Sequence, residues 1–219
     1  TRFTVSPVNL SQRYARHFLN NGGIIELEEV KGVKPHFNGV DVRLSNREVS
    51  FSQLVICTGV ASKALLSPLG INVPLVSERG YHLSLDIGDK RLTRPVGWLD
   101  KAVFMTPMAD GVRLAGTAEF AFADTPLNQQ RAEAMLEHAK VMLGDTPAIK
   151  STWVGSRPST PDSLPVIGRM PDAPNVHVAF GHGHLGLTFG AITGKLITES
   201  IQGQATSVDL SPFSVARFS

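Results

Sequence analysis

The sequence contains only one cysteine, Cys57, among its 219 residues. A single cysteine excludes an internal disulfide framework and any cysteine-rich zinc site, and it favours a reducing, cytoplasmic compartment. No apolar stretch approaches the roughly 18 residues that a transmembrane segment needs. The net charge is only +2, from 21 basic and 19 acidic residues, which is too small to favour nucleic acid as a partner. The remaining composition, 42% hydrophobic and 18% charged, is that of an ordinary globular protein.

The first third of the chain has signals of helix, hairpin and buried strand. Ser6 and Pro7 are a typical helix start, and the apolar spacing after them predicts a helix over residues 7–20. Alternating residues with an Asn-Gly pair predict a hairpin within 24–44. The apolar run 54–58 is typical of a strand that is buried on both faces in a parallel sheet.

The middle of the chain has a different pattern, and the end returns to the first one. Short strand-like runs with turn residues between them predict an antiparallel sheet over 76–150. A helix that opens at Thr125-Pro126 and stops at Gly144 is expected to cover this sheet. The last third predicts a strand at 176–180 and a helix at about 187–202. The whole pattern indicates an α+β fold in which 1–75 and 151–219 form one discontinuous domain.

A glycine-rich loop joins the last predicted strand to the last helix: Gly181-His182-Gly183-His184-Leu185-Gly186. A strand, a glycine loop and a helix start together present backbone N–H groups to an anion. The spacing is Gly-x-Gly-x-x-Gly, but the acidic residue that usually follows about 20 positions later in a dinucleotide site is missing. The loop is therefore either a ligand-binding loop or only a tight turn. No third metal-coordinating residue lies near His182 and His184 in the sequence. We therefore favour these histidines as the polar lining of a binding site over a metal site.

Two further segments contain candidate binding residues. Arg157 precedes Pro158, which restricts the backbone there, and its guanidinium can bind a carboxylate with two hydrogen bonds. The alternative is an internal ion pair with Asp162. Tyr81 and His82 are neighbours on a predicted strand, so only one of them can face a given side. Either one of the two lines a pocket or the pair lies on an ordinary exposed strand, and both alternatives remain open.

Four segments, taken in order, resemble the carboxyl-terminal half of the FAD-dependent amine oxidoreductases of the D-amino acid oxidase superfamily. The first is similar to the family's strand that ends in an Ala-Thr-Gly type of turn, and the second to the opening of the substrate sheet in the D-amino acid dehydrogenase branch. The third is similar to its Gly-x-Arg-Pro-x-Thr-Pro-Asp pattern, and the fourth to its flavin-contacting loop. These segments are Val55–Ser62, Glu78–His82, Gly155–Gly168 and Gly181–Thr188.

The resemblance implies a fold, a cofactor and roles for particular residues. The discontinuous domain would be an incomplete Rossmann-like FAD-binding domain, and 76–150 would be the substrate-binding sheet. Arg157 would hold the substrate carboxylate, and Tyr81 or His82 would line the substrate side. The residues implied to contact FAD are Val30, Gly59, Gly181, His182, Gly183, His184, Leu185, Gly186, Leu187 and Thr188.

The implied reaction is the oxidative deamination of a D-amino acid or a related secondary amine by hydride transfer to flavin. A carrier or a membrane quinone would accept the electrons, with the enzyme cytoplasmic or peripheral to the inner membrane. Two alternatives remain: a glycine or sarcosine oxidase that uses oxygen, and a non-catalytic subunit completed by another chain. The family's amino-terminal Gly-x-Gly-x-x-Gly turn is not in this sequence. We therefore expect a carboxyl-terminal fragment that binds FAD weakly by itself.

Overall fold

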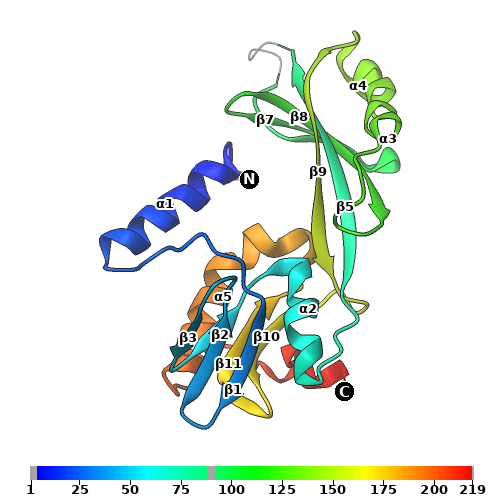
Figure 1. Ribbon diagram of the computed structural model, residues 1–219. Helices are drawn as coiled ribbons and strands as arrows, with labels where there is room; N and C mark the ends of the chain where they lie inside the picture. Colours follow the sequence, from blue (N-terminus) through cyan, green and yellow to red (C-terminus); the bar gives the residue numbers. More distant parts are fainter. Residues whose placement is uncertain (1–3, 88–91, 219) are drawn as a thin grey trace. The chain divides into compact units, whose positions relative to one another are not determined.

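The computed structural model describes residues 4–87 and 92–218, and the chain separates into two compact units (Figure 1). Unit 1 contains the chain up to Ile25 together with Arg79–Ser156, and unit 2 contains Glu26–Glu78 and Arg157–Ser219. We expected residues 1–25 to belong with 151–219. The structure instead groups them with the middle of the chain, where the Ala109 N–H donates to the Val5 carbonyl oxygen (3.0 Å).

Unit 1 begins with helix α1 (Pro7–Asn20), which confirms the helix predicted at 7–20. The Ser6 hydroxyl oxygen accepts a hydrogen bond from the Asn9 N–H (3.2 Å), and Pro7 occupies the first turn. This arrangement satisfies one of the free N–H groups that every helix start leaves. The helix ends before Gly22, which has a φ of +85°.

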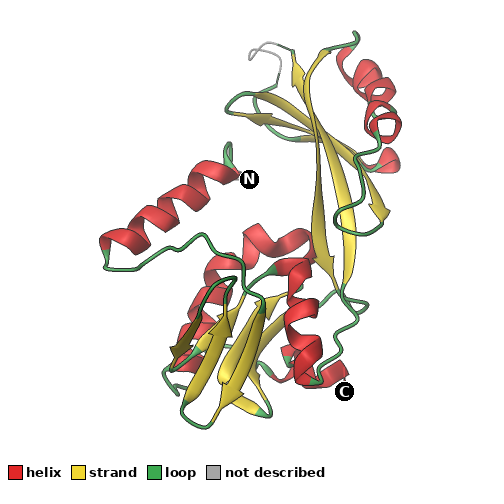
Figure 2. Cartoon of the chain, in the orientation of Figure 1, coloured by secondary structure: helices red, strands yellow, loops and turns green. Residues whose placement is uncertain are grey.

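The main body of unit 1 is an antiparallel sheet, as predicted for 76–150 (Figure 2). The order of its five strands is β6-β7-β8-β5-β9. Their bounds are β5 Val76–Asp86, β6 Val96–Trp98, β7 Val103–Met108, β8 Gly111–Phe120 and β9 Ala148–Ser159. Strand β9 was not predicted, and both boundaries between the units lie within strands, β5 and β9.

Two short helices, α3 (Gln129–Glu133) and α4 (Leu136–Leu143), pack on one face of this sheet. The prediction of one helix from Thr125-Pro126 is wrong at its start. Asn128 is the N-cap instead, because its side-chain oxygen accepts the Arg131 N–H (3.0 Å). The predicted end at Gly144 is confirmed. Alternate strand residues form the core with these helices: Tyr81, Leu83, Leu85, Val103, Met105, Leu114, Ala132, Met135 and Ala139.

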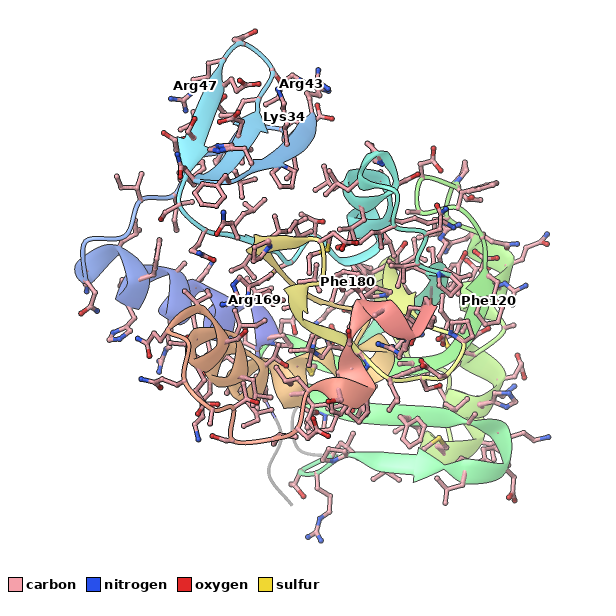
Figure 3. The ribbon with its side chains drawn as sticks, turned by 90° about the horizontal axis from the view of Figure 1, so that it is seen from below. Lys34, Arg43, Arg47, Phe120, Arg169 and Phe180 are labelled. Atoms are coloured by element: carbon pink, nitrogen blue, oxygen red, sulfur yellow. The ribbon has the colours of Figure 1, made fainter. Side chains whose placement is uncertain are left out.

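Unit 2 contains two small sheets. The first is the antiparallel set β1 (Gly32–His36), β2 (Gly39–Arg43) and β3 (Glu48–Phe51), which confirms the predicted hairpin within 24–44. Figure 3 shows Lys34 and Arg43 on this sheet and Arg47 close to them in the turn between β2 and β3. Arg47, in the turn before β3, donates to the carboxylates of Glu26 and Glu28 (2.7 and 2.6 Å). These contacts fix the segment that precedes β1.

The second sheet of unit 2 has the order β10-β11-β4, with bounds Val166–Met170, Ala173–Phe180 and Leu54–Ile56. Strands β4 and β11 are parallel, with Leu54 opposite Val176, so the two predicted apolar strands belong to one sheet. The expectation of burial on both faces is wrong for β4, where only Ile56 is buried. The reason is the position of β4 at the edge of this sheet.

Helix α5 (Gly186–Ile201) follows β11 and buries Thr193, Leu196 and Ile197, close to the predicted bounds of 187–202. Helix α2 (Ser62–Leu66) and six short 3-10 segments complete the elements of the described chain. The core of unit 2 joins both sheets through residues such as Val40, Ile56, Val178 and Phe180. None of the helices in 4–87 and 92–218 is long and apolar enough to cross a membrane.

Candidate functional site

The guanidinium of Arg157 lies near the end of β9, within unit 2, and its partner is Glu78 on β5. The Arg157 Nη1 donates to Glu78 Oε1 at 3.3 Å, and the Arg157 side chain is 30% exposed. A guanidinium has five N–H donors, and this contact uses one nitrogen. Arg157 therefore has donors left for a ligand carboxylate while it is held in place by an ion pair.

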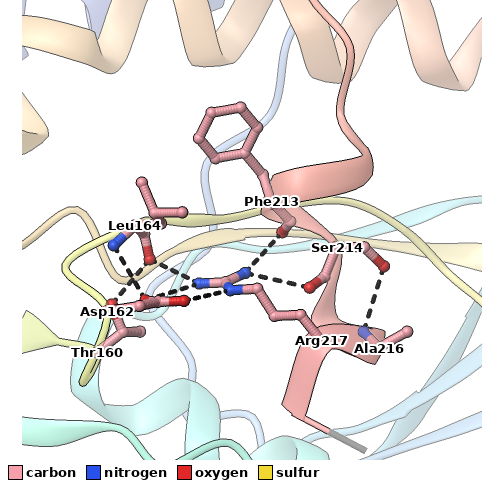
Figure 4. A network of polar contacts seen from close by, with 7 residues as sticks. All are labelled: Thr160, Asp162, Leu164, Phe213, Ser214, Ala216 and Arg217. Atoms are coloured by element: carbon pink, nitrogen blue, oxygen red, sulfur yellow. Dashed lines mark hydrogen bonds and ion pairs between the residues drawn. The ribbon is translucent and has the colours of Figure 1, made fainter.

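The alternative partner for Arg157, Asp162, is bound to a different arginine. Figure 4 shows Asp162 facing Arg217, whose Nε donates to Asp162 Oδ2 at 2.8 Å. Arg217 also donates to the carbonyl oxygens of Leu164, Phe213 and Ser214. The hydrogen bond from Arg217 lowers the pKa of Asp162 to about 2. This network fastens the carboxyl-terminal segment to the turn after β9, and the suggested Arg157–Asp162 pair does not form.

The glycine loop follows β11 and leads into α5, as the sequence indicated. Gly181 and Gly183 have φ values of +79° and +51°, a region that residues with a side chain rarely adopt. A Cβ at Gly183 would have Ser159 Oγ at 3.6 Å, so the loop passes close to the end of β9. The glycines are therefore required by the backbone conformation of the loop.

The two loop histidines have different surroundings. His182 Nε2 lies 2.9 Å from Thr193 Oγ1, and burial lowers the pKa of His182. His184 is largely exposed, and its Nε2 lies 2.8 Å from Glu78 Oε1. Within the part of the chain that the structure describes, no group of three or more His, Cys, Asp or Glu side chains is arranged to hold a metal ion.

The other residues named as FAD contacts are also in unit 2. Gly59, after β4, has a φ of +57° and no atom within 4 Å of the place a Cβ would occupy. Val30 precedes β1 and packs partly against the core of the unit. Leu185, Leu187 and Thr188 surround the start of α5 and are exposed. Every predicted cofactor residue therefore belongs to the same unit as Arg157.

A small apolar cavity of about 260 Å³ lies in this unit, beneath α5. It is lined by Val55, Cys57, Ala179, His182, Gly190, Thr193, Gly194 and Ile197. Burial raises the pKa of the Cys57 thiol, which keeps that thiol protonated. The cavity lies between strands β4 and β11 and the middle turns of α5, and His182 of the glycine loop forms part of its lining.

The structure places Tyr81 and His82 on opposite faces of the unit 1 sheet, as alternation requires. Tyr81 is 1% exposed, and its hydroxyl donates to Glu119 Oε1 (2.5 Å) in the core that α3 and α4 cover. This burial gives no support to Tyr81 as a substrate contact. His82 is half-buried and stacks on Trp153, with the ring centroids 4.8 Å apart. Of the pair, only His82 lies on the face that the helices leave open.

His82 makes the stability of unit 1 depend on pH. Burial lowers its pKa from 6.5 to about 4, with the Arg113 charge adding to the effect. The unfolded chain therefore binds more protons than the folded chain between these values, and the folded state loses stability as the pH falls from 6.5 towards 4. We expect His82→Gln to reduce this loss, measured as the difference in urea midpoint between pH 7 and pH 5. An unchanged difference in the variant would contradict the assignment.

The residues of unit 2 fit an FAD molecule on the following observations. The first turn of α5 has no side-chain cap, and N–H groups at a helix start can bind an electron-rich carbonyl oxygen such as that of a flavin. The open space at Gly59 and the left-handed glycines of the loop allow close approach to the backbone. These features are compatible with a flavin beside the glycine loop.

Comparisons with known proteins agree with this geometry. Residues 1–200 match the family described as "DAO: FAD dependent oxidoreductase". The chain is 34% identical over 210 residues to a D-amino-acid oxidase of Bradyrhizobium diazoefficiens, covering 93% of this chain and 50% of that protein. It is 35% identical over 186 residues to a D-amino acid dehydrogenase of Xanthobacter autotrophicus, covering 81% and 43%.

A solved structure gives the same result for the fold. The crystal structure of glycine oxidase from Geobacillus kaustophilus superposes with a TM-score of 0.88 at 22% identity, over 95% of this chain and 57% of that one. Fold, loop and comparisons together define the class of FAD-dependent oxidoreductases. The chain belongs to the D-amino acid oxidase (DAO) family of that class. It spans about half the length of the curated relatives that it matches.

Sequence reasoning missed the role of Glu78 in this site. Glu78 was recognised only as the first residue of the segment Glu78–His82, with no partner assigned. In the structure its carboxylate contacts Arg157, Ser159 and His184. An acidic residue two positions after the apolar pair Leu75-Val76 was the available signal, since a carboxylate on a strand that enters the core needs a cationic partner.

Proposed function

We propose that this chain supplies the substrate-anchoring and flavin-contacting part of an enzyme that oxidises a D-amino acid or a related secondary amine. The observation that carries the proposal is the position of Arg157. Its guanidinium is held by Glu78, keeps free donors, and lies in the same compact unit as the glycine loop. The relatives named D-amino-acid oxidase and D-amino acid dehydrogenase support the choice of substrate class.

The proposed chemistry divides between the cofactor and the chain. FAD, when bound, would supply the two-electron acceptor for the substrate Cα hydride, and water would hydrolyse the resulting iminium ion to an oxo acid and an ammonium or alkylammonium ion. Arg157 binds the substrate carboxylate with two parallel hydrogen bonds and so fixes the position of Cα. The start of α5, which has no side-chain cap, carries partial positive charge that would stabilise negative charge on a reduced flavin bound beside it.

The dehydrogenase branch is the preferred form of this proposal, because the segment Glu78–His82 resembles that branch. A carrier or a membrane quinone would then take the electrons. A glycine or sarcosine oxidase that passes electrons to oxygen is the second candidate, and the fold similarity to glycine oxidase is compatible with it. Oxygen consumption compared with dye or quinone reduction separates the two.

The proposal is tested by anaerobic reduction of the flavin in a full-length enzyme that carries this sequence. A set of D-amino acids, their L-isomers, glycine, sarcosine and amines without a carboxylate would be mixed with the enzyme. We expect loss of the flavin absorbance with at least one D-amino acid and none with the matching amine that has no carboxylate. Reduction by the amine as readily as by the amino acid would contradict the proposal.

A further inference from the structure

We propose that Glu78 is a positioning residue that fixes the Arg157 guanidinium relative to the glycine loop. The inference rests on the proposed function and adds a residue to which no role was assigned. Glu78 lies on β5, Arg157 and Ser159 on β9, and His184 in the loop before α5. One carboxylate therefore connects two strands and the loop.

The contacts of Glu78 are specific and use both of its oxygens. Oε1 accepts from Arg157 Nη1 at 3.3 Å and lies 2.8 Å from His184 Nε2, whereas Oε2 accepts from Ser159 Oγ at 3.0 Å. The Glu78 side chain is only 15% exposed. A carboxylate with three donors at such low exposure is already satisfied, so it does not itself bind the substrate amine. Its role is to hold other groups.

The surroundings of Ser159 are independent support for this role. The Cβ position of Gly183 lies 3.6 Å from Ser159 Oγ, so the loop backbone packs on the residue that also binds Glu78. Two contacts therefore hold the loop against the end of β9: the hydrogen bonds of Glu78 and the packing of Gly183 on Ser159. Arg157 lies two residues before Ser159, and its side chain leaves from a part of the strand that cannot shift freely.

Charge and geometry predict opposite effects of Glu78 on a carboxylate ligand. A negative charge beside Arg157 weakens the attraction of the site for a carboxylate. Misplacement of an anchoring group by about 1 Å, however, costs roughly 100-fold in rate. Ser159 Oγ and His184 Nε2 also contact the Glu78 carboxylate, and these hydrogen bonds disperse part of its charge and weaken the repulsion. We therefore expect the positioning effect to exceed the repulsion.

The test compares Glu78→Ala and Glu78→Gln with wild type in a full-length flavoenzyme that carries this sequence. Binding of propionate and of propionamide is followed by the change in flavin absorbance, and kcat and KM are measured with a D-amino acid. We expect Glu78→Ala to weaken propionate binding and to lower kcat/KM by about 10- to 100-fold. Glu78→Gln keeps a hydrogen-bond acceptor for Arg157, so its propionate affinity and its kcat/KM should fall less than those of Glu78→Ala. Propionamide binding should stay within about twofold, because it does not need the ion-pairing fork.

A double-mutant cycle separates positioning from a general structural role. In an Arg157→Ala background, Glu78→Gln should have no further effect on propionate binding, because the group that it positions is gone. The exposed Glu137→Gln change in α4 is the matched control and should leave all values unchanged.

Three outcomes would overturn the inference. The first is equal weakening of propionate and propionamide binding, and the second is tighter propionate binding in Glu78→Gln. The third is an additive effect in the cycle. If Glu78→Ala does not fold, Glu78→Gln and the cycle decide the question alone. An inactive wild type overturns the proposed function, whereas an active wild type with unaffected Glu78 variants overturns only this inference.

Discussion

Replacing Arg157 with alanine in a full-length enzyme that carries this sequence is expected to lower kcat/KM for a D-amino acid severely. The carboxylate is the one charged group, besides the reacting amine, that all amino acid substrates share. Loss of a charge-assisted pair in a site shielded from water costs roughly 2–5 kcal/mol. This corresponds to a loss of about 30-fold to several thousand-fold in kcat/KM. The measurement is steady-state kinetics with the flavin content of each variant determined in parallel.

Two further variants make this experiment specific. Arg157→Lys should lose activity within or just below the same range, because an ammonium group cannot form the two parallel hydrogen bonds of a guanidinium. Arg169→Ala is the matched control, because this arginine is exposed on β10 and donates to the Ser200 carbonyl oxygen (3.3 Å) rather than to a carboxylate of the site. Its kcat/KM should stay near that of wild type. Activity of Arg157→Ala within about threefold of wild type, well under one decade, would reduce the role of Arg157 to its ion pair with Glu78.

The second large effect is expected in the core of unit 1, where Glu119→Gln should strongly destabilise the fold. Arg79 is 1% exposed, and its Nη1 lies 3.1 Å from Glu119 Oε1. Tyr81 donates to the same carboxylate, and Arg131 Nε lies 3.4 Å from its other oxygen. Removing the negative partner leaves a buried cation uncompensated, which costs about 3–5 kcal/mol. Because Glu119 is 18% exposed, we expect a loss near the lower end of that range.

Urea unfolding followed by tryptophan fluorescence measures this effect directly, because Trp98 and Trp153 both belong to unit 1. Glu137→Gln, the same substitution at an exposed position of α4, should change the free energy of unfolding by less than about 0.5 kcal/mol. Adding Arg79→Met to Glu119→Gln should recover part of the loss, since the unpaired charge is then removed. A Glu119→Gln variant as stable as wild type would show that water reaches Arg79 and that the pair is dispensable.

The elements that the sequence predicted well are those specified by neighbouring residues. Helix α1 has its cap, its first-turn proline and its glycine stop within its own segment, and α5 has a glycine at each end. Strand β9 was missed because it contains Gly155 and Pro158, residues typical of turns. Its pairing along the sheet outweighs these local preferences, which are weak in strands.

The candidate site was predicted by residue type but not by partner. Arg157 and the loop histidines stay predictions as site residues, and the partner of Arg157, Glu78, lies 79 residues away in the sequence. Only the fold decides whether Arg157 pairs with Glu78 or with Asp162, which is nearby in the sequence. Burial of Tyr81 is a similar case, because alternation predicts that one of Tyr81 and His82 is covered without saying which. The position of α3 and α4 settles that choice.

The parallel pair of β4 and β11 also has a consequence for the order in which the chain can fold. Leu54 and Val176 are 122 residues apart, and the larger part of unit 1, Arg79–Ser156, lies between them. The β7–β8 hairpin closes over a few residues and can form as soon as it leaves the ribosome, whereas the β4–β11 ladder must wait for the last fifth of the chain. Such distant pairing slows folding, because a long loop has to close before any contact compensates for its lost entropy. During that interval β4 lacks its β11 partner, and an unpaired strand edge of this kind is open to wrong pairing with other chains.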